Sequence, residues 1–259
     1  MVAPGYLEVR KVSPVMSEEE KEMTIWDHLG ELRNRLFIAL ISLVVTTLLS
    51  FIFADRFIQI LAIPMPGGLQ SLLAIEVTEN ISVFMKVSLL SGFILALPFI
   101  LYELLAFVLP GLTDSERRWV IISIPMASVF FLLGVAFCYF VMLPAAIPFL
   151  TGFLGVKTTP RLSSYIGFVT NMMFWIGVSF ELPLLVFILA KLNIVNAKML
   201  ARQWRIAVVI IAVVAAVVTP TPDPVNMSLM MAPLMVLYLI SIFFAMLARR
   251  GRSDSVMKK

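Results

Sequence analysis

Acidic side chains in or beside strongly apolar segments are the residues of this chain that could do chemistry. An ionisable group near hydrocarbon is costly, so each one indicates a function by default. With one His and one Cys, the chain cannot form a structural zinc site or a Cys/His nucleophilic pair from its own side chains. A metal site is therefore not expected, and we also expect no cofactor and no enzymatic activity. The four candidate positions are Glu31, Glu116, Glu181 and Asp223.

Glu31 lies in residues 26–36, which read W-D-H-L-G-E-L-R-N-R-L. Apolar residues recur in this stretch at helical spacing, which predicts an amphipathic helix along the cytoplasmic membrane surface. Arg35 follows Glu31 by four residues, so the two side chains could pair on one face of that helix. This internal pair and a role in binding are equally compatible with the sequence.

Glu116 lies in residues 110–119, which read P-G-L-T-D-S-E-R-R-W and link two apolar segments. Thr113 followed three residues later by Glu116 is the capping-box pattern of a helix start. A glutamate in the first turn also complements the positive end of the helix dipole. From physical chemistry alone, a capping role is favoured here.

The neighbouring sequence explains the presence of Asp223 more fully than that of Glu181. Glu181 lies inside an apolar segment, in G-V-S-F-E-L-P-L, where no neighbour in the sequence neutralises it. It predicts either a water-filled cavity or a docking point for a polar group of a partner helix or a transported species. Asp223 lies in T-P-T-P-D-P, a stiff turn in which Asp is an ordinary residue, so a structural role is at least as consistent.

The elements that position these side chains are predicted to be membrane-spanning helices. Hydrophobic residues make up 61% of the chain and the mean hydropathy is +1.00, which exclude an ordinary soluble domain. A helix needs about 20 apolar residues to cross the hydrocarbon core. We expect an all-α, polytopic fold: a kinked, concave bundle with two short C-terminal spans, between a disordered tail (1–21) and a basic tail (249–259). The six predicted spans of this single domain (22–248) lie near residues 35–54, 83–108, 119–142, 166–190, 205–218 and 228–247.

The basic residues predict how the chain is oriented. With the N-terminus inside, most Lys and Arg lie on the cytoplasmic side. We therefore expect a multi-pass protein of the cytoplasmic membrane with both termini cytoplasmic and an uncleaved first span. The basic pI is explained by this topology and by attraction to anionic lipid, so nucleic-acid binding is not needed. The basic residues that remain outside are Arg56, Lys86, Lys157 and Arg161.

Several strings occur together in register. They are H-L-G-E-L-R-N-R-L at 28–36, A-F-V-L-P-G-L-T-D-S-E-R-R at 106–118 and G-V-S-F-E-L-P at 177–183, with Pro64, A-F-C-Y-F at 136–140 and T-P-T-P-D-P in support. This set resembles the TatC family, the multispanning receptor subunit of the twin-arginine protein translocase. The resemblance covers about residues 20–250 on a matching six-span plan. T-P-T-P-D-P departs from the compact T-P-P-D of some members.

The resemblance implies a receptor for signal peptides with two consecutive arginines, which passes folded cargo to single-span TatA and TatB partners, driven by the proton-motive force. It implies that Glu31 and Glu116 receive the arginine pair, since a carboxylate accepts the guanidinium fork in bidentate fashion. Glu181 maps onto a glutamate that engages partner helices, and Pro64 and Asp223 map onto outer positions that matter for transport. Self-association is left open. The patch around the two glutamates is implied to comprise Arg33, Phe107, Pro110 and Leu112.

Two other classes of function stay open. An ion-coupled small-solute transporter would use Glu181 as its ion site, although the sequence shows no inverted repeat with paired broken helices. An intramembrane hydrolase would need a nucleophile, a carboxylate pair or a metal at membrane depth. No predicted span has two carboxylates, which disfavours the hydrolase.

Overall fold

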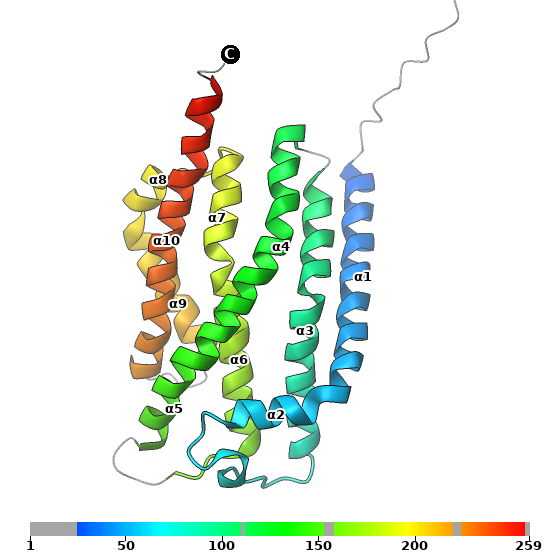
Figure 1. The fold of residues 1–259 in the computed structure, drawn as a ribbon, viewed down its shortest axis with the longest axis vertical. Helices are drawn as coiled ribbons and strands as arrows, with labels where there is room; N and C mark the ends of the chain where they lie inside the picture. Colours follow the sequence, from blue (N-terminus) through cyan, green and yellow to red (C-terminus); the bar gives the residue numbers. More distant parts are fainter. Residues whose placement is uncertain (1–24, 110–111, 153–157, 220–223, 257–259) are drawn as a thin grey trace, which may run out of the picture.

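The computed structural model describes residues 25–109, 112–152, 158–219 and 224–256, and this part of the chain is almost entirely helical. Five helical segments are long and apolar enough to cross a membrane. Figure 1 shows the segments packed side by side, with the start of α1 and the end of α10 at the same end of the bundle. The predicted all-α membrane fold is confirmed. The sixth span stays a prediction, because the helix over that segment is shorter than the other five.

The first two long segments form an antiparallel pair. α1 (Ile25–Ser50) continues through a 3₁₀ turn (Phe51–Phe53) into α2 (Ala54–Ala62), which crosses one end of the bundle in Figure 1. α3 (Glu79–Val108) then returns beside α1. The prediction of a helix along the membrane surface at residues 26–36 is wrong. This stretch joins the apolar run after it without a helix breaker, so both form one continuous α1.

The next segment extends further than predicted. α4 (Asp114–Phe137) passes through a π-helical turn (Cys138–Met142) into α5 (Leu143–Gly152). The predicted span 119–142 therefore ends inside a longer helical segment. Pro144 sits in the first turn of α5, where a helix tolerates proline because the missing N–H would have no partner inside that helix.

α6 (Leu162–Phe180) and α7 (Leu182–Lys191) are one apolar segment broken at Glu181. Pro183 has no N–H to donate, and its ring excludes the carbonyl four residues earlier. The α-helical hydrogen bonds therefore stop and start again, and Glu181 is both the C-cap of α6 and the N-cap of α7.

The C-terminal part contains α8 (Ala197–Arg202), α9 (Trp204–Val218) and α10 (Pro224–Val256). α9 has 15 residues, as the short fifth span requires. α10 has 33 residues and contains the predicted span 228–247; that this span is short stays a prediction. Its apolar part, Met227–Ala248, is long enough to cross a membrane, and the polar residues after it continue the helix.

A glycine lets the backbones of α1 and α3 touch. A Cβ on Gly92 would lie 2.5 Å from the Cα of Thr47, so a side chain at this position would require the backbone to move. The hydroxyl of Thr46 donates a hydrogen bond of 2.8 Å to the Gly92 carbonyl. This contact fixes the register of the two helices.

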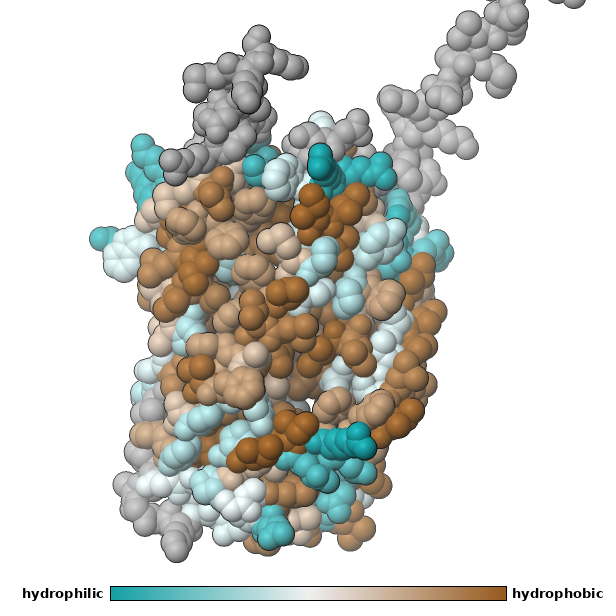
Figure 2. Space-filling model, in the orientation of Figure 1, coloured by the Kyte–Doolittle hydropathy of each residue, from teal (hydrophilic) through white to brown (hydrophobic). Residues whose placement is uncertain are grey.

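The surface of the bundle suits hydrocarbon. Figure 2 shows apolar residues covering most of the side of the molecule, with the strongly hydrophilic residues gathered mainly toward its two ends. The core lies where α3, α4 and α6 meet, around fully buried Phe131, Ile166 and Ile176. Large apolar side chains such as Ile52 and Val217, each 74% exposed, would favour aggregation in water but are matched to lipid in a bilayer.

Candidate functional site

A charged triplet joins α1 to α3 at the end of the bundle where α1 begins and α3 ends. We call this end the α1 end, and the opposite end, crossed by α2, the α2 end (Figure 1). Arg35 donates to Oε1 of Glu31 from Nη2 over 2.6 Å and from Nε over 2.9 Å, and to Oε2 of Glu103 from Nη1 over 3.2 Å. The side chains are 26%, 22% and 14% exposed for Arg35, Glu31 and Glu103, so the protein shields most of the triplet.

The register of the two helices explains why these side chains meet. Arg35 comes eleven residues before Thr46 on α1, and Glu103 comes eleven residues after Gly92 on α3. Eleven residues are about three helical turns, so both positions return to the face that contains the Thr46–Gly92 contact. In an antiparallel pair, the close approach at Gly92 therefore sets Arg35 opposite Glu103.

Glu31 retains an unused acceptor. Its Oε2 is buried and has no hydrogen-bond partner among the described residues. The triplet contains two carboxylates and one guanidinium, so an ionised triplet has a net charge of about −1. The pairing of Glu31 with Arg35, which the sequence left open, is present in the structure, and it leaves Oε2 of Glu31 without a hydrogen bond.

Aromatic and apolar groups border the triplet. The rings of His28 on α1 and Phe107 on α3 are stacked, with centroids 4.1 Å apart and an interplanar angle of 17°. Arg33 is exposed on α1, and Leu112 is half-buried in the connection to α4. The structure therefore brings Glu31 and Phe107 into one patch at the α1 end, with Arg33 and Leu112 at the same end of the molecule.

Glu116 is in the first turn of α4, which Figure 1 places at the α1 end. α4 begins directly after Thr113, as the capping pattern predicts, and the N–H of Arg117 donates to the Thr113 carbonyl over 2.8 Å. The side chain of Glu116, and Pro110 as a whole, lie outside the described residues. The arrangement of two carboxylates for two arginines therefore stays a prediction.

Glu103 was missed in the sequence, although a signal for it was present. It is a carboxylate inside the predicted span 83–108, and the same criterion selected Glu181. Helical spacing predicts Glu31 as a partner for Arg35, and no local pattern indicates a second partner. Only the packing of α3 on α1 shows that Arg35 is shared between two carboxylates.

Glu181 lies beside a tight crossing of α4 and α6. A Cβ on Gly134 would lie 2.9 Å from the Cα of Gly177, so two glycines let these helices touch. The ring of Phe180 packs against Phe137 with centroids 5.6 Å apart. Oε1 of Glu181 is buried there with no hydrogen-bond partner among the described residues. A buried polar atom of this kind requires an explanation.

A second polar cluster lies at the α2 end. The buried Glu79 of α3 accepts hydrogen bonds from Nε of Arg161 over 3.1 Å and from the N–H groups of Ser163 and Ile75 over 2.6 and 2.9 Å. Arg161 also contacts Glu76 over 2.7 Å. Its hydrogen bonds, first to Glu76 and then to Glu79, raise the pKa of Arg161. The cluster ties the chain before α3 to the chain before α6.

Pro64 and Asp223 are the two predicted functional positions in connections between helices, and the structure describes only the first. Pro64 is half-buried in the turn after α2, where the N–H of Met65 donates to the Ala62 carbonyl over 3.0 Å. Asp223 lies outside the described residues. Their roles in transport stay predictions.

Comparison with known proteins identifies close relatives. A family model described as "Sec-independent protein translocase protein (TatC)" matches residues 27–233. The TatC protein of Carboxydothermus hydrogenoformans is 37% identical over 229 residues, which cover 88% of this chain and 94% of that protein. The chloroplastic TATC protein of Pisum sativum is 37% identical over 234 residues, covering 90% of this chain and 66% of that protein. Two crystal structures of the twin-arginine translocase receptor TatC, one in the detergent DDM, superpose with TM-scores of 0.75 and 0.77 at 35% and 34% identity. They cover 86% and 84% of this chain, and each is matched over 99% of its own length.

Proposed function

Because this chain belongs to the TatC family of Sec-independent protein translocase proteins, we propose that it is the receptor subunit of a twin-arginine translocase and binds signal peptides with two consecutive arginines. The family is a component of a protein translocase rather than an enzyme family.

The unpartnered Oε2 of Glu31 carries the proposal. Arg35 and Glu103 fix the Glu31 carboxylate between α1 and α3, so the position of its remaining acceptor is set before a ligand arrives. One arginine of the signal peptide binds this oxygen. Glu116, on the adjoining turn of α4, receives the second arginine. Phe107 and Leu112 supply the apolar border of the site, with Arg33 and Pro110 beside it.

Arginine is favoured over lysine at such a site. A guanidinium presents several donors in a rigid plane, so it can bind a fixed carboxylate oxygen and a neighbouring acceptor together. A lysine ammonium is a strongly hydrated point charge, and it loses more hydration for fewer directed bonds. Two separate carboxylates would therefore select two arginines.

We further propose how the chain lies in the membrane and with which partners it assembles. The α1 end faces the cytoplasm and the chain lies in the cytoplasmic membrane, as the basic residues predict. Folded cargo passes to TatA- and TatB-type single-span partners, driven by the proton-motive force. The buried Oε1 of Glu181 supports a role as the acceptor for a polar group of a partner helix.

Peptide binding to the purified protein in nanodiscs tests this function. We expect a fluorescent Arg-Arg signal peptide to bind more tightly than its Lys-Lys counterpart. Glu31→Gln and Glu116→Gln should each raise the Kd for the Arg-Arg peptide by about tenfold or more, since a hydrogen bond to a charged group contributes about 1.5–3 kcal/mol.

Glu76→Gln is the matched control, because it removes the same charge at the α2 end and should leave the Kd unchanged. Glu103→Gln should have an intermediate effect, since it acts only by holding Arg35 and Glu31 in place. Unchanged Arg-Arg binding in the Glu31→Gln/Glu116→Gln double variant would refute the proposed site.

A further inference from the structure

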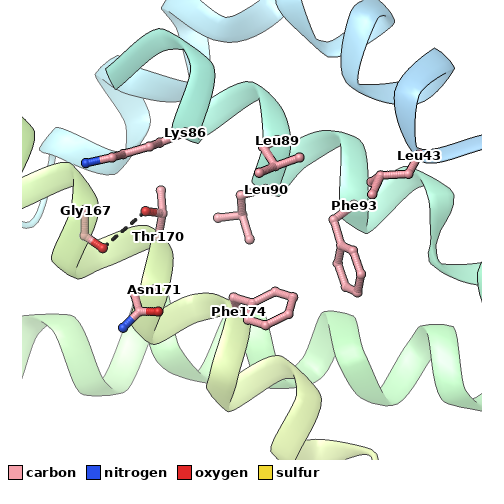
Figure 3. Close-up of a pocket in the computed structure, with 9 residues that line it drawn as sticks. All are labelled: Leu43, Lys86, Leu89, Leu90, Phe93, Gly167, Thr170, Asn171 and Phe174. Atoms are coloured by element: carbon pink, nitrogen blue, oxygen red, sulfur yellow. Dashed lines mark hydrogen bonds between the residues drawn. The ribbon is translucent and has the colours of Figure 1, made fainter. Parts of the chain in front are cut away.

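Lys86 lies at the junction of two hollows on one side of the bundle. The first is a groove of about 550 Å³ between α1, α3 and α6, with apolar walls that include Leu89, Leu90, Phe93 and Phe174. Figure 3 shows the ammonium of Lys86 at one end of this groove and Phe93 at the other. The groove therefore has a cationic end and an apolar end.

The second hollow continues from the first toward the α2 end. It has a volume of about 630 Å³ and shares Lys86 and Gly167 with the groove. Its walls carry hydroxyl groups, including Thr151, Thr158 and Ser164. A polar chamber and an apolar channel thus meet at a single cation, which is the layout that an amphiphile with an anionic headgroup requires.

Lys86 has no counter-charge among the described residues. It belongs to the third turn of α3, about 10 Å from Glu79 along the helix axis. The carboxylates in that direction, Glu79 and Glu76, are both bound to Arg161. Helices α5 and α6, which carry most of the opposite wall, contain no acidic residue, and α1 has none after Glu31. The exposed ammonium therefore forms no ion pair with a described residue and is free to bind an anion from outside the described chain.

The other polar groups of the groove already have partners. The hydroxyl of Thr170 donates to the carbonyl of Ile166 over 2.7 Å, and the side-chain amide of Asn171 donates to the carbonyl of Val218 over 2.8 Å. Lys86 is thus the residue of this groove whose donors point into open space.

We propose that the groove and its polar chamber bind an anionic phospholipid, with the phosphate on Lys86, the rest of the headgroup in the hydroxyl-lined chamber and an acyl chain along the apolar groove. A lysine near the end of a span reaches toward the headgroup region, where lipid phosphate is abundant. The apolar channel runs from the cation toward the middle of α3, as an acyl chain does from its headgroup. This fits a lipid better than a side-chain carboxylate of a partner helix.

Native mass spectrometry of the full chain in mixed micelles tests the proposal, with phosphatidylglycerol and phosphatidylcholine as probes. We expect the wild type to retain phosphatidylglycerol at about tenfold lower lipid concentration than phosphatidylcholine. Lys86→Gln should abolish this preference, whereas Lys86→Arg should keep it. Arg56→Gln is the matched control: it removes a cation from the exposed surface of α2, outside the groove, and should keep the preference.

A second variant narrows the groove and keeps the charge of Lys86. A Cβ at Gly167 would meet only Nζ of Lys86, at 3.3 Å, so a larger side chain there extends into the groove and leaves the packed helices in place. Gly167→Leu should weaken retention of phosphatidylglycerol about tenfold with an unchanged circular dichroism spectrum. This result would support the proposal even if Lys86→Gln failed to fold.

Three outcomes would overturn the proposal: no preference for phosphatidylglycerol in the wild type, full preference in both Lys86→Gln and Gly167→Leu, or equal loss in Arg56→Gln. If Lys86→Gln keeps its lipid preference and instead loses crosslinking to a single-span partner protein, the occupant is a carboxylate of that partner.

Discussion

A buried carboxylate oxygen without a partner recurs at two positions, Oε2 of Glu31 and Oε1 of Glu181. The two differ in their surroundings. Glu31 shares Arg35 with Glu103, so its carboxylate is oriented and its local charge is partly compensated. Glu181 lies at a helix break beside the glycine crossing of α4 and α6, in a mostly apolar environment. The first suits a cationic ligand and the second suits a neutral or hydrogen-bonding group.

This difference predicts that the two glutamates are functionally separable. Glu181→Ala should reduce coprecipitation of a TatA- or TatB-type partner several-fold while changing the Kd for the Arg-Arg peptide less than twofold. Glu31→Gln should show the opposite pattern, and so serves as its control. Partner recovery at the wild-type level in Glu181→Ala, with transport retained, would remove Glu181 from the partner interface.

Between elements, long-range polar contacts connect segments that local sequence does not relate. At the α2 end, Leu73 and Arg161 form an isolated parallel β-bridge, and Glu79 accepts from Arg161 and from the backbone of Ser163. Together they fasten the chain before α3 to the chain before α6. Because Lys86 and Gly167 lie one to two turns further along these helices, the same contacts also set the width of the groove between them.

The two carboxylates around Arg161 predict unequal losses of stability. Glu79→Gln replaces an acceptor that is fully buried and bonded to four donors with a side chain that presents an N–H₂ to them, so the Tm should fall by about 5 °C or more. Glu76→Gln removes a partner of the same arginine, but its side chain is 62% exposed and the Tm should change by about 2 °C or less. Thermal unfolding in detergent distinguishes them; equal shifts would show that burial of Glu79 contributes nothing.

Across the whole molecule, the termini of the described chain lie at one end and α2 lies at the other. Basic residues at the α1 end predict that it faces the cytoplasm. The lone cysteine, Cys138, is buried, and burial raises the barrier to its modification, so an introduced cysteine can report on one side of the membrane.

Labelling of intact cells with a membrane-impermeant maleimide tests this topology in a Cys138→Ser background. Val77, 97% exposed at the α2 end, should react as Val77→Cys in intact cells. Lys198→Cys in α8, which Figure 1 places at the α1 end, should react only after permeabilisation. The reverse pattern would invert the proposed orientation. Labelling of both introduced cysteines in intact cells would contradict the predicted number of membrane spans between residues 77 and 198.

Local sequence determined much of this protein: the all-helical membrane fold, the approximate positions of the long segments, the start of α4 after Thr113 and the isolated Glu181. These features depend on apolar run length, capping and helix breaking, which act within a few residues of the chain. It misjudged where α1 begins, because a helix with no breaker extends beyond its apolar run. It also misjudged where the helical segment after α4 ends, because Pro144 and Pro148 do not end α5.

Only the tertiary structure decided which distant groups meet. The pairing of Arg35 with Glu103 depends on the close approach at Gly92, and the burial of Glu79 depends on the chain before α6. The isolation of Lys86 likewise depends on which faces of α3 and α6 are apposed. Helical spacing predicts contacts between residues three or four positions apart in one helix. The contacts described here depend on the register and rotation of whole helices, which no local pattern specifies.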